Sequence, residues 1–186
     1  MNAYLNGKQL AFEDDIINPN LLSNTSLNGD SNKWNYLEGG AKWDHLDYSS
    51  DTSKLKSKYF TFYNNNDKGT ISLEDNIFLP KSTYTFSMKV FNGRTPNFTN
   101  ESYPFTITAT IDGKEIELAS VNIPVIYKWH SVSVTFNVSG NLTAIKLNVV
   151  EGIPNGSMDL TEWKLEYGNI PTPWCPSIFD YYPKLK

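Results

Sequence analysis

Alternation of apolar and polar residues is the dominant pattern along this chain. Residues 82–91 place tyrosine, phenylalanine, methionine and valine at every second position, with serine, threonine and lysine between them. Residues 105–111 and 131–138 alternate in the same way. A period of two is typical of a strand with one buried and one wet face, the pattern of antiparallel sheets. The pattern therefore predicts an all-β protein with Tyr84, Phe86, Phe105 and Phe136 in its core.

Turn residues separate these runs at the spacing of a sandwich. Asp112-Gly113 stands between two alternating runs and predicts a tight hairpin, and Ser139-Gly140-Asn141 marks a second turn. The apolar phase flips around Thr161-Glu162, which predicts a β-bulge there. About nine to eleven short strands at this spacing indicate a two-sheet antiparallel β-sandwich, most simply a jelly roll.

Two segments stand outside the predicted sandwich of residues 19–176. Residues 1–18 contain a miniature hairpin, Tyr4-Leu5-Asn6-Gly7-Lys8. A two-stranded hairpin is marginal alone, so we expect an arm for attachment or assembly that pairs with a neighbour. Prolines recur through residues 171–186 and disfavour regular structure there. We expect that stretch to lie along the sandwich or to lead to a partner, with residues 177–186 as an extended tail.

Charge and hydropathy exclude several classes of partner. The net charge is −4 with no basic stripe, so the sequence predicts no nucleic-acid partner. It has no long apolar run or basic amphipathic helix, so we expect no membrane partner. Cys175 is the single cysteine, which excludes an intramolecular disulfide. The first residues show no secretory signal pattern.

Aromatic and amide side chains are unusually common. Aromatics make up 14% of the chain and asparagine occurs 21 times. Sugars offer C–H faces that pack on aromatic rings and hydroxyls that bond to amides, so this composition favours a carbohydrate ligand. Two regions supply candidates, and each has a plainer reading. Trp34, Tyr36 and Trp43 are core or a stacking platform. The long connection after residue 91 is a solvated loop or a ligand site. Its candidate residues are Asn92, Arg94, Asn97, Phe98, Asn100 and Tyr103.

Catalytic motifs are not recognisable in the sequence. A glycosidase needs two carboxylates across a cleft, and the acids here form no such motif. Glu162, Lys164 and Glu166 lie near one another on a predicted strand and read as a solvated face. Trp129, Trp163 and Trp174 read as structural, with Trp174 closing the last strand against the sandwich. We therefore expect a protein that is not an enzyme.

The last third of the chain carries a more specific pattern. Asp159-Leu160-Thr161-Glu162-Trp163-Lys164-Leu165-Glu166-Tyr167-Gly168-Asn169, followed by Thr172-Pro173-Trp174 and Pro176, resembles the closing strand of phage tail and baseplate carbohydrate-binding domains. The segment Asn20–Ser26 and the strands around residues 84–89 and 129–136 resemble the same family more loosely. Cys175 stands where that pattern often has threonine or serine. The resemblance covers about residues 20–176.

The resemblance implies a non-catalytic jelly-roll module that binds host cell-wall polysaccharide. It implies a place in the virion, in the tail of a phage of Gram-positive bacteria, beside other tail and baseplate proteins. Manufacture in the bacterial cytoplasm fits the absence of a signal pattern. The rival expectation is a structural connector of the tail without a sugar site. Such modules commonly hold a structural calcium, and Asp159 has a similar position, with Asn24, Ser26 and Asp30 nearby in the implied fold.

Overall fold

The computed structural model describes residues 4–5, 8–9, 18–22, 42–44, 59–63, 71–75, 77–92, 102–124, 126, 128–149 and 157–177. Every regular element in this part of the chain is a strand, as the alternation predicts. The strands are β1 (Tyr4–Leu5), β2 (Lys8–Gln9), β3 (Lys42–Asp44), β4 (Tyr59–Tyr63), β5 (Ile71–Asp75), β6 (Ser82–Asn92), β7 (Ser102–Ile111), β8 (Lys114–Pro124), β9 (His130–Val138), β10 (Leu142–Val149) and β11 (Ser157–Tyr167).

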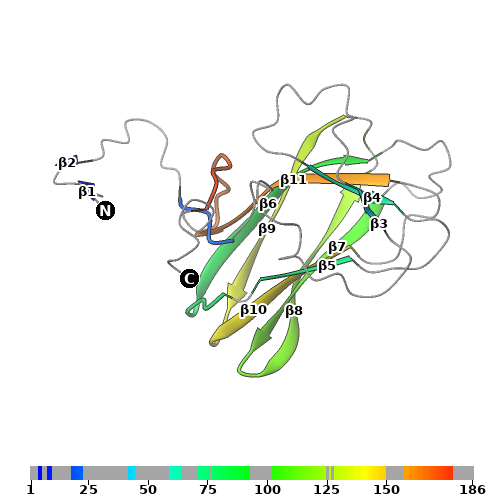
Figure 1. Cartoon of the computed structure of the whole chain (residues 1–186). Helices are drawn as coiled ribbons and strands as arrows, with labels where there is room; N and C mark the ends of the chain where they lie inside the picture. The colour runs from blue at the N-terminus through cyan, green and yellow to red at the C-terminus, as the bar shows by residue number, and fades with distance from the viewer. Residues whose placement is uncertain are drawn as a thin grey trace.

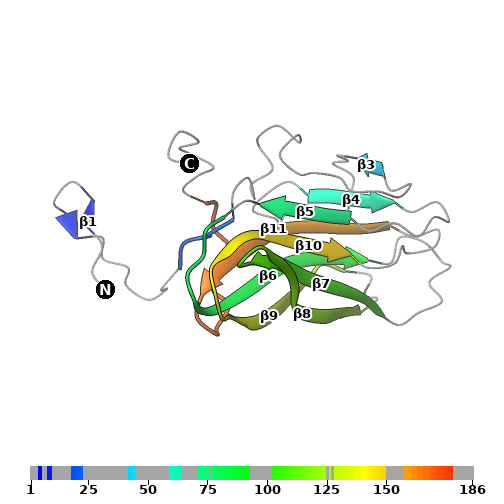
Figure 2. The ribbon, with the colours of Figure 1, turned by 90° about the horizontal axis from the view of Figure 1, so that it is seen from below.

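The strands form two large antiparallel sheets and one small one. The four-stranded sheet has the order β5-β10-β7-β8, and the five-stranded sheet has the order β3-β4-β11-β6-β9. These sheets make up the β-sandwich of a jelly roll, as predicted (Figure 1; Figure 2). β1 and β2 pair with each other as a separate two-stranded sheet, which confirms the predicted hairpin. Whether this arm pairs with a neighbour stays a prediction.

The core lies between the two large sheets. On β6 the predicted residues Tyr84 and Phe86 are buried, and on β7 Phe105 and Ile107 are buried. The rings of Phe86 and Phe105 stack across the sandwich, with centroids 5.7 Å apart and planes 9° from parallel. Phe136 on β9 is also buried, so all four predicted core aromatics are confirmed.

Local backbone geometry confirms the predicted turn and bulge. Asp112 and Gly113 join β7 to β8 with φ values of 49° and 78°, the left-handed values that a two-residue hairpin needs. In β11 the register to β6 shifts between Thr161 and Lys164, and Glu162 has a φ of 53°. A non-glycine residue in this region signals a local constraint, here an insertion into one strand of a pair.

Two irregular segments complete the surface around β11. Residues 18–22 run beside the C-terminal half of β11, where the amide of Leu21 donates to the carbonyl of Leu165 at 2.8 Å. Residues 171–177, which we call the strap, return along β11 and meet residues 18–22. The side chain of Asn20 donates to the carbonyl of Cys175 at 3.2 Å. Figure 1 shows these two segments side by side at one end of the sandwich. The strap thus lies along the sandwich, which is one of the two courses expected for residues 171–186.

The strap explains why one sequence-based interpretation is wrong. Glu162, Lys164 and Glu166 were expected on a solvated face, but all three are buried, and Lys164 and Glu166 are completely inaccessible. On the opposite side of the same strand, Trp163 and Leu165 are buried in the core. β11 is therefore covered on both faces, because the strap lies over the side that points away from the core.

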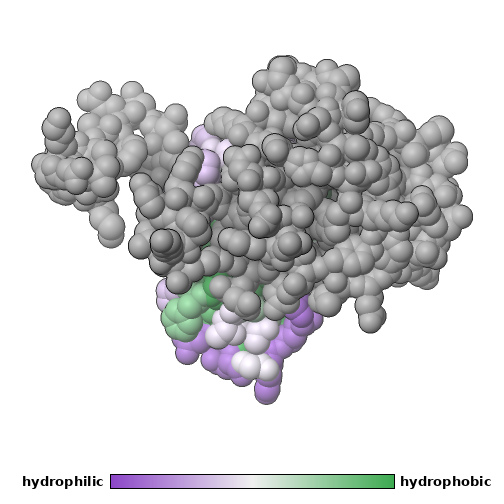
Figure 3. Space-filling view, viewed as in Figure 1, coloured by the Kyte–Doolittle hydropathy of each residue, from purple (hydrophilic) through white to green (hydrophobic). Residues whose placement is uncertain are grey.

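The remaining surface is mainly polar where the structure describes it. In the view of Figure 3, apolar surface appears as a small area at the lower end of the sandwich, bordered by hydrophilic surface. The large hydrophobic side chains that stand exposed are Phe78, Ile116, Tyr167 and Ile170. Among the described residues, no helix has the length and hydropathy that a membrane crossing requires.

Candidate functional site

A hollow of about 370 Å³ lies on the outer face of the five-stranded sheet. Volumes in this range are typical of small-molecule sites. Three parts of the fold enclose the hollow: neighbouring strands β6 and β9, the bulge of β11, and the strap. The lining residues are Ser87, Met88, Lys89, Ser131, Val132, Ser133, Glu162, Pro171, Thr172, Pro173 and Trp174.

The floor of the hollow consists of short polar side chains on β6 and β9. Ser87 stands opposite Ser133 and Lys89 stands opposite Ser131 in the antiparallel register. Because neighbours on β6 such as Met88 point into the core, these four residues point outward. The floor therefore presents three hydroxyls and one amine to whatever occupies the hollow.

The same face continues as a polar ladder beyond the hollow. Thr85 and Thr135 lie next along β6 and β9, with their hydroxyl oxygens 3.0 Å apart. Thr83 follows and donates to the side-chain oxygen of Asn137 at 2.7 Å. Cross-strand pairs of this kind hold side chains in fixed directions. The outer face of β6 and β9 is thus an ordered row of hydroxyl and amide groups.

The β-bulge places a carboxylate in the hollow. Strict alternation would make Glu162 point toward the core after Thr161, but the bulge brings it to the outer face. There its Oε2 lies 2.9 Å from Nζ of Lys89. Glu162 is almost inaccessible and Lys89 is partly exposed. The pair presents a positive donor and a negative acceptor side by side, so the charges of the hollow balance.

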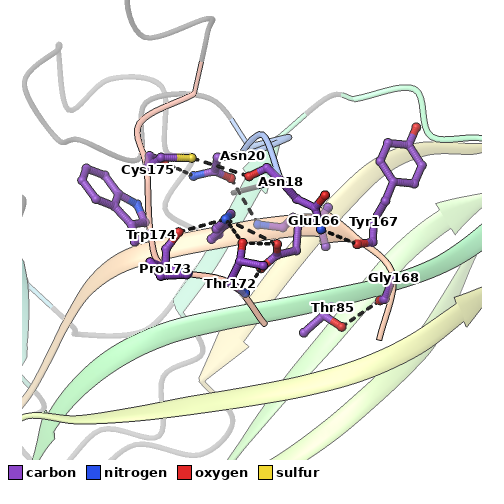
Figure 4. A network of polar contacts seen from close by, with 12 residues as sticks. Asn18, Asn20, Thr85, Glu166, Tyr167, Gly168, Thr172, Pro173, Trp174 and Cys175 are labelled. Carbon is purple, nitrogen blue, oxygen red and sulfur yellow. Dashed lines mark hydrogen bonds and ion pairs between the residues drawn. The ribbon is translucent and has the colours of Figure 1, made fainter. Parts of the chain in front are cut away.

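Trp174 on the strap forms a wall of the hollow. Its indole Nε1 donates to the carbonyl of Trp163 at 3.1 Å, and its side chain is half-buried. In Figure 4 the indole projects from the strap on the side away from Tyr167. A half-exposed ring at the edge of a polar hollow is a suitable stacking surface for an apolar ligand face.

Two further aromatic rings lie beyond Lys89 in the direction of the end of β6. Phe91 and Trp129 are both half-buried, and their ring centroids lie 5.8 Å apart with planes at 52°. Phe91 has the same strand parity as Ser87 and Lys89, so it belongs to the outer face. Polar floor, ion pair and aromatic rings therefore follow one another along a single face of the sheet.

The predicted ligand-binding residues fall in other parts of the chain. Trp43, Asn92 and Tyr103 lie in β3, β6 and β7, where their backbones pair with Phe62, Met158 and Ile123. β6 ends at Asn92 and β7 begins at Ser102, so Asn92 and Tyr103, which were expected in the long loop, belong to strands. The residues that lie outside the described part of the chain are Trp34, Tyr36, Arg94, Asn97, Phe98 and Asn100. A binding role for these nine residues stays a prediction.

Asp159, the predicted calcium ligand, is fully buried in β11, between Thr61 of β4 and Phe91 of β6. Calcium needs six to eight oxygen ligands. Among the described residues, no three histidine, cysteine, aspartate or glutamate side chains come together as a metal site. The other donors expected near Asp159 are Asn24, Ser26 and Asp30, all outside the described residues. The calcium site therefore stays a prediction.

Sequence reasoning did not select the residues that line this hollow. The alternation placed Ser87 and Lys89 on a wet face, and the phase flip located the bulge. These two signals locate Lys89 and the bulge at Glu162 separately, and only the pairing of β6 with β11 brings the two side chains together. Trp174, expected to close the last strand against the sandwich, does bond to the carbonyl of Trp163 on that strand, and it also lines the hollow. The structural interpretation of Trp163 is correct, since that side chain is fully buried.

Comparison with known proteins identifies the fold. No protein-family model matches the chain, and no curated protein matches its sequence. The CBM22-1 xylan-binding domain of Paenibacillus barcinonensis Xyn10C aligns with 83% of this chain and 97% of its own, at 12% identity and a TM-score of 0.52. TmCBM61, solved with beta-1,4-galactotriose, aligns with 80% of this chain and 99% of its own, at 13% identity and a TM-score of 0.50.

A viral protein shares the same architecture. The enzymatically active domain of bacteriophage CBA120 tailspike protein 4 aligns with 80% of this chain at 11% identity and a TM-score of 0.56. The alignment spans 21% of that tailspike chain. At these identities the comparisons establish shared architecture. The chain has the β-sandwich fold of carbohydrate-binding modules.

Proposed function

We propose that this protein is a non-catalytic carbohydrate-binding domain that holds a glycan in the hollow on its five-stranded sheet. The observation that carries the proposal is the half-buried indole of Trp174 beside a floor of three serines and the Lys89–Glu162 pair. A sugar ring has one face that stacks on an aromatic ring and a rim of hydroxyls that need donors and acceptors. The hollow offers both.

Each part of the hollow has a role in binding. Trp174 stacks against the sugar, which contributes roughly 0.5–1.5 kcal/mol by analogy with aromatic pairs. Lys89 donates to a hydroxyl oxygen, and Glu162 accepts from a neighbouring hydroxyl. The serines of β6 and β9 bond to the rest of the ring. Few contacts of this size make a weak single site, so strong adhesion requires several copies on one particle.

The lining of the hollow supports binding without catalysis. Hydrolysis of a glycosidic bond generally uses two carboxylates on either side of the bond. Among the described residues that line the hollow, Glu162 is the one carboxylate, and it is paired with Lys89. This arrangement favours recognition of hydroxyls over general acid–base chemistry.

The proposed setting is the tail or baseplate of a phage that adheres to host cell-wall polysaccharide. The closing motif of residues 159–176 supports this setting through its resemblance to phage baseplate domains. The shared architecture with a tailspike domain is compatible with it. The partners are then the wall polysaccharide and neighbouring tail proteins, and the location is the virion. We include Arg94 and Phe98, from the connection between β6 and β7, among the proposed glycan contacts.

The test compares, in one binding assay, two variants that each lose one aromatic ring. Trp174→Ala removes the stacking ring, and Phe78→Ala removes a 70% exposed ring outside the hollow. We expect the first change to weaken binding to purified cell walls, or to hits from a glycan array, by about tenfold. The second change should leave binding unaltered. Equal binding by wild type and the Trp174 variant would refute the hollow as the glycan site.

A structural connector is the second candidate, and one observation favours it. The described segments that lead into and out of the sandwich meet at one end, where Asn20 bonds to the backbone of the strap. Such convergence suits a domain mounted on a neighbour. Removal of residues 1–17 separates the two candidates. Lost assembly with intact cell-wall binding marks the arm as an anchor and the sandwich as the adhesin.

A further inference from the structure

The strap is locked to β11 by a buried charged network. Nζ of Lys164 donates to Oγ1 of Thr172 at 2.5 Å and to the carbonyl of Pro173 at 2.9 Å. Glu166 accepts from Thr172 twice, from its amide at 2.8 Å and from its hydroxyl at 2.6 Å. Lys164 and Glu166 also form an ion pair at 3.3 Å. Thr172 is therefore held by three hydrogen bonds (Figure 4).

The next residues of the strap are tied to the bulge of β11. The carbonyl of Trp163 accepts from Nε1 of Trp174 at 3.1 Å and from the side chain of Asn20 at 2.8 Å. The bond from Nε1 of Trp174 sets where its indole lies along β11. Thr172 and Trp174 are two residues apart, so the charged network and the indole tie act on one short stretch of backbone.

Packing alone does not explain the charged network. Two fully buried charges lose their hydration, and well-packed apolar residues of similar size are often as stabilising as a buried ion pair. What the network adds is direction, since each charged atom bonds to a defined atom of the strap. The backbone stretch that the network holds leads directly to Trp174, which forms a wall of the hollow.

We propose that Thr172 is a positioning residue, which seats the indole of Trp174 at the edge of the hollow through its bonds to Lys164 and Glu166. Both hydrogen-bonding partners lie beneath the strap and are not part of the hollow's lining. The positioning role rests on the proposed glycan function only for its consequence, the affinity. The position of the indole is itself measurable without any ligand.

Three variants test the proposal. Thr172→Val keeps the shape of the side chain and removes the hydroxyl that bonds to both charges. Thr172→Ser keeps the hydroxyl as the matched control. Lys164→Met with Glu166→Leu removes both charges together, so that neither remains buried alone. The five tryptophans give five indole N–H signals in an NMR spectrum, and Trp174→Phe identifies that of Trp174.

We expect the Trp174 signal to shift or broaden in Thr172→Val and in the double variant, and to keep its position in Thr172→Ser. Binding to the glycan identified with wild type should weaken about tenfold in the first two, comparable to loss of the ring. An unchanged Trp174 signal in Thr172→Val overturns the positioning role. A displaced signal with unchanged affinity supports the positioning role and counts instead against Trp174 as a glycan contact.

Failure of the proposed function would look different. If wild type binds no cell-wall preparation and no glycan on the array, the carbohydrate function fails. The indole signal still decides the positioning role in that case. A folded spectrum of the double variant, with the core signals in place, shows that the effect on Trp174 does not come from unfolding.

Discussion

One lysine–glutamate pair on the outer face of each large sheet, Lys146–Glu115 and Lys164–Glu166, allows a comparison of opposite surroundings. Lys146 on β10 and Glu115 on β8 approach to 2.6 Å on the four-stranded sheet, where Glu115 is 57% exposed. Lys164 and Glu166 on β11 lie 3.3 Å apart on the five-stranded sheet, with no exposure of either side chain. The shorter distance belongs to the pair in water.

The difference shows that surroundings, and not distance, decide what an ion pair does. Water and salt screen the exposed pair, which leaves it little net energy. The buried pair has lost its hydration and depends on its partners in the strap. One sheet therefore shows a solvated polar face, whereas the other has its charges fixed under a segment that forms a wall of the hollow.

The largest expected effect comes from breaking the buried pair on one side. Lys164→Met leaves Glu166 charged and buried without its partner, which costs about 3–5 kcal/mol of unfolding free energy. Urea denaturation followed by fluorescence measures the loss. The double change Lys164→Met with Glu166→Leu should recover most of that stability. A single variant as stable as wild type would contradict the view that this pair is sealed from water.

The next largest effect on stability is expected at Asn20, an uncharged side chain near the buried Lys164–Glu166 pair. Asn20 is buried and satisfies four backbone groups, the carbonyls of Trp163 and Cys175 and the amides of Leu22 and Leu165. Asn20→Ala leaves these groups without the amide and should cost about 2–3 kcal/mol.

Asn20→Asp separates the contribution of the hydrogen bonds that Asn20 accepts from that of the bonds it donates. The aspartate keeps an acceptor for the two amides and loses the donor for the two carbonyls. The melting temperature of Asn20→Asp should therefore fall between those of wild type and Asn20→Ala. A melting temperature of Asn20→Ala equal to wild type would show that residues 18–22 add nothing to the fold.

Tyr84 shows how an uncharged polar group is buried on the inner side of β6. Its hydroxyl donates to the carbonyl of Pro80 at 2.7 Å, and burial, with a smaller contribution from Tyr167, raises the pKa of Tyr84 well above its ordinary value. The folded protein thus keeps this proton at a pH where the unfolded chain releases it. The contribution to stability is complete below about pH 10 and falls as the pH rises further.

Tyr84→Phe removes both the bond and the titration. We expect a loss of about 1 kcal/mol at neutral pH and a shallower decline of stability above pH 10 than in wild type. Denaturant midpoints at several pH values test this expectation. Parallel curves for the two proteins would argue against a role for this hydroxyl.

The smallest effect is expected at the exposed pair. Lys146→Met should change the unfolding free energy by less than about 1 kcal/mol, because solvent screens the attraction to Glu115. High salt should reduce the difference from wild type further. A loss as large as that of Lys164→Met would remove the contrast between the two sheets.

The sandwich, its core and its irregular points could all be predicted from the amino-acid sequence. Alternation depends only on which side chains avoid water, so it located β6, β7 and β9 and their buried aromatics. The hairpin at Asp112-Gly113 and the bulge at Thr161-Glu162 follow from local backbone rules, and both are confirmed. These features require no knowledge of what lies beside each strand.

The burial of the polar side of β11 and the residues that form the hollow became visible only in the folded protein. Alternation predicts that Lys164 and Glu166 point away from the core, but it cannot predict that residues 171–177 return over them. The hollow joins Lys89, Glu162 and Trp174 from three separate segments of the chain. Contacts between distant segments depend on how the chain returns across the sheet, and no local pattern encodes that path.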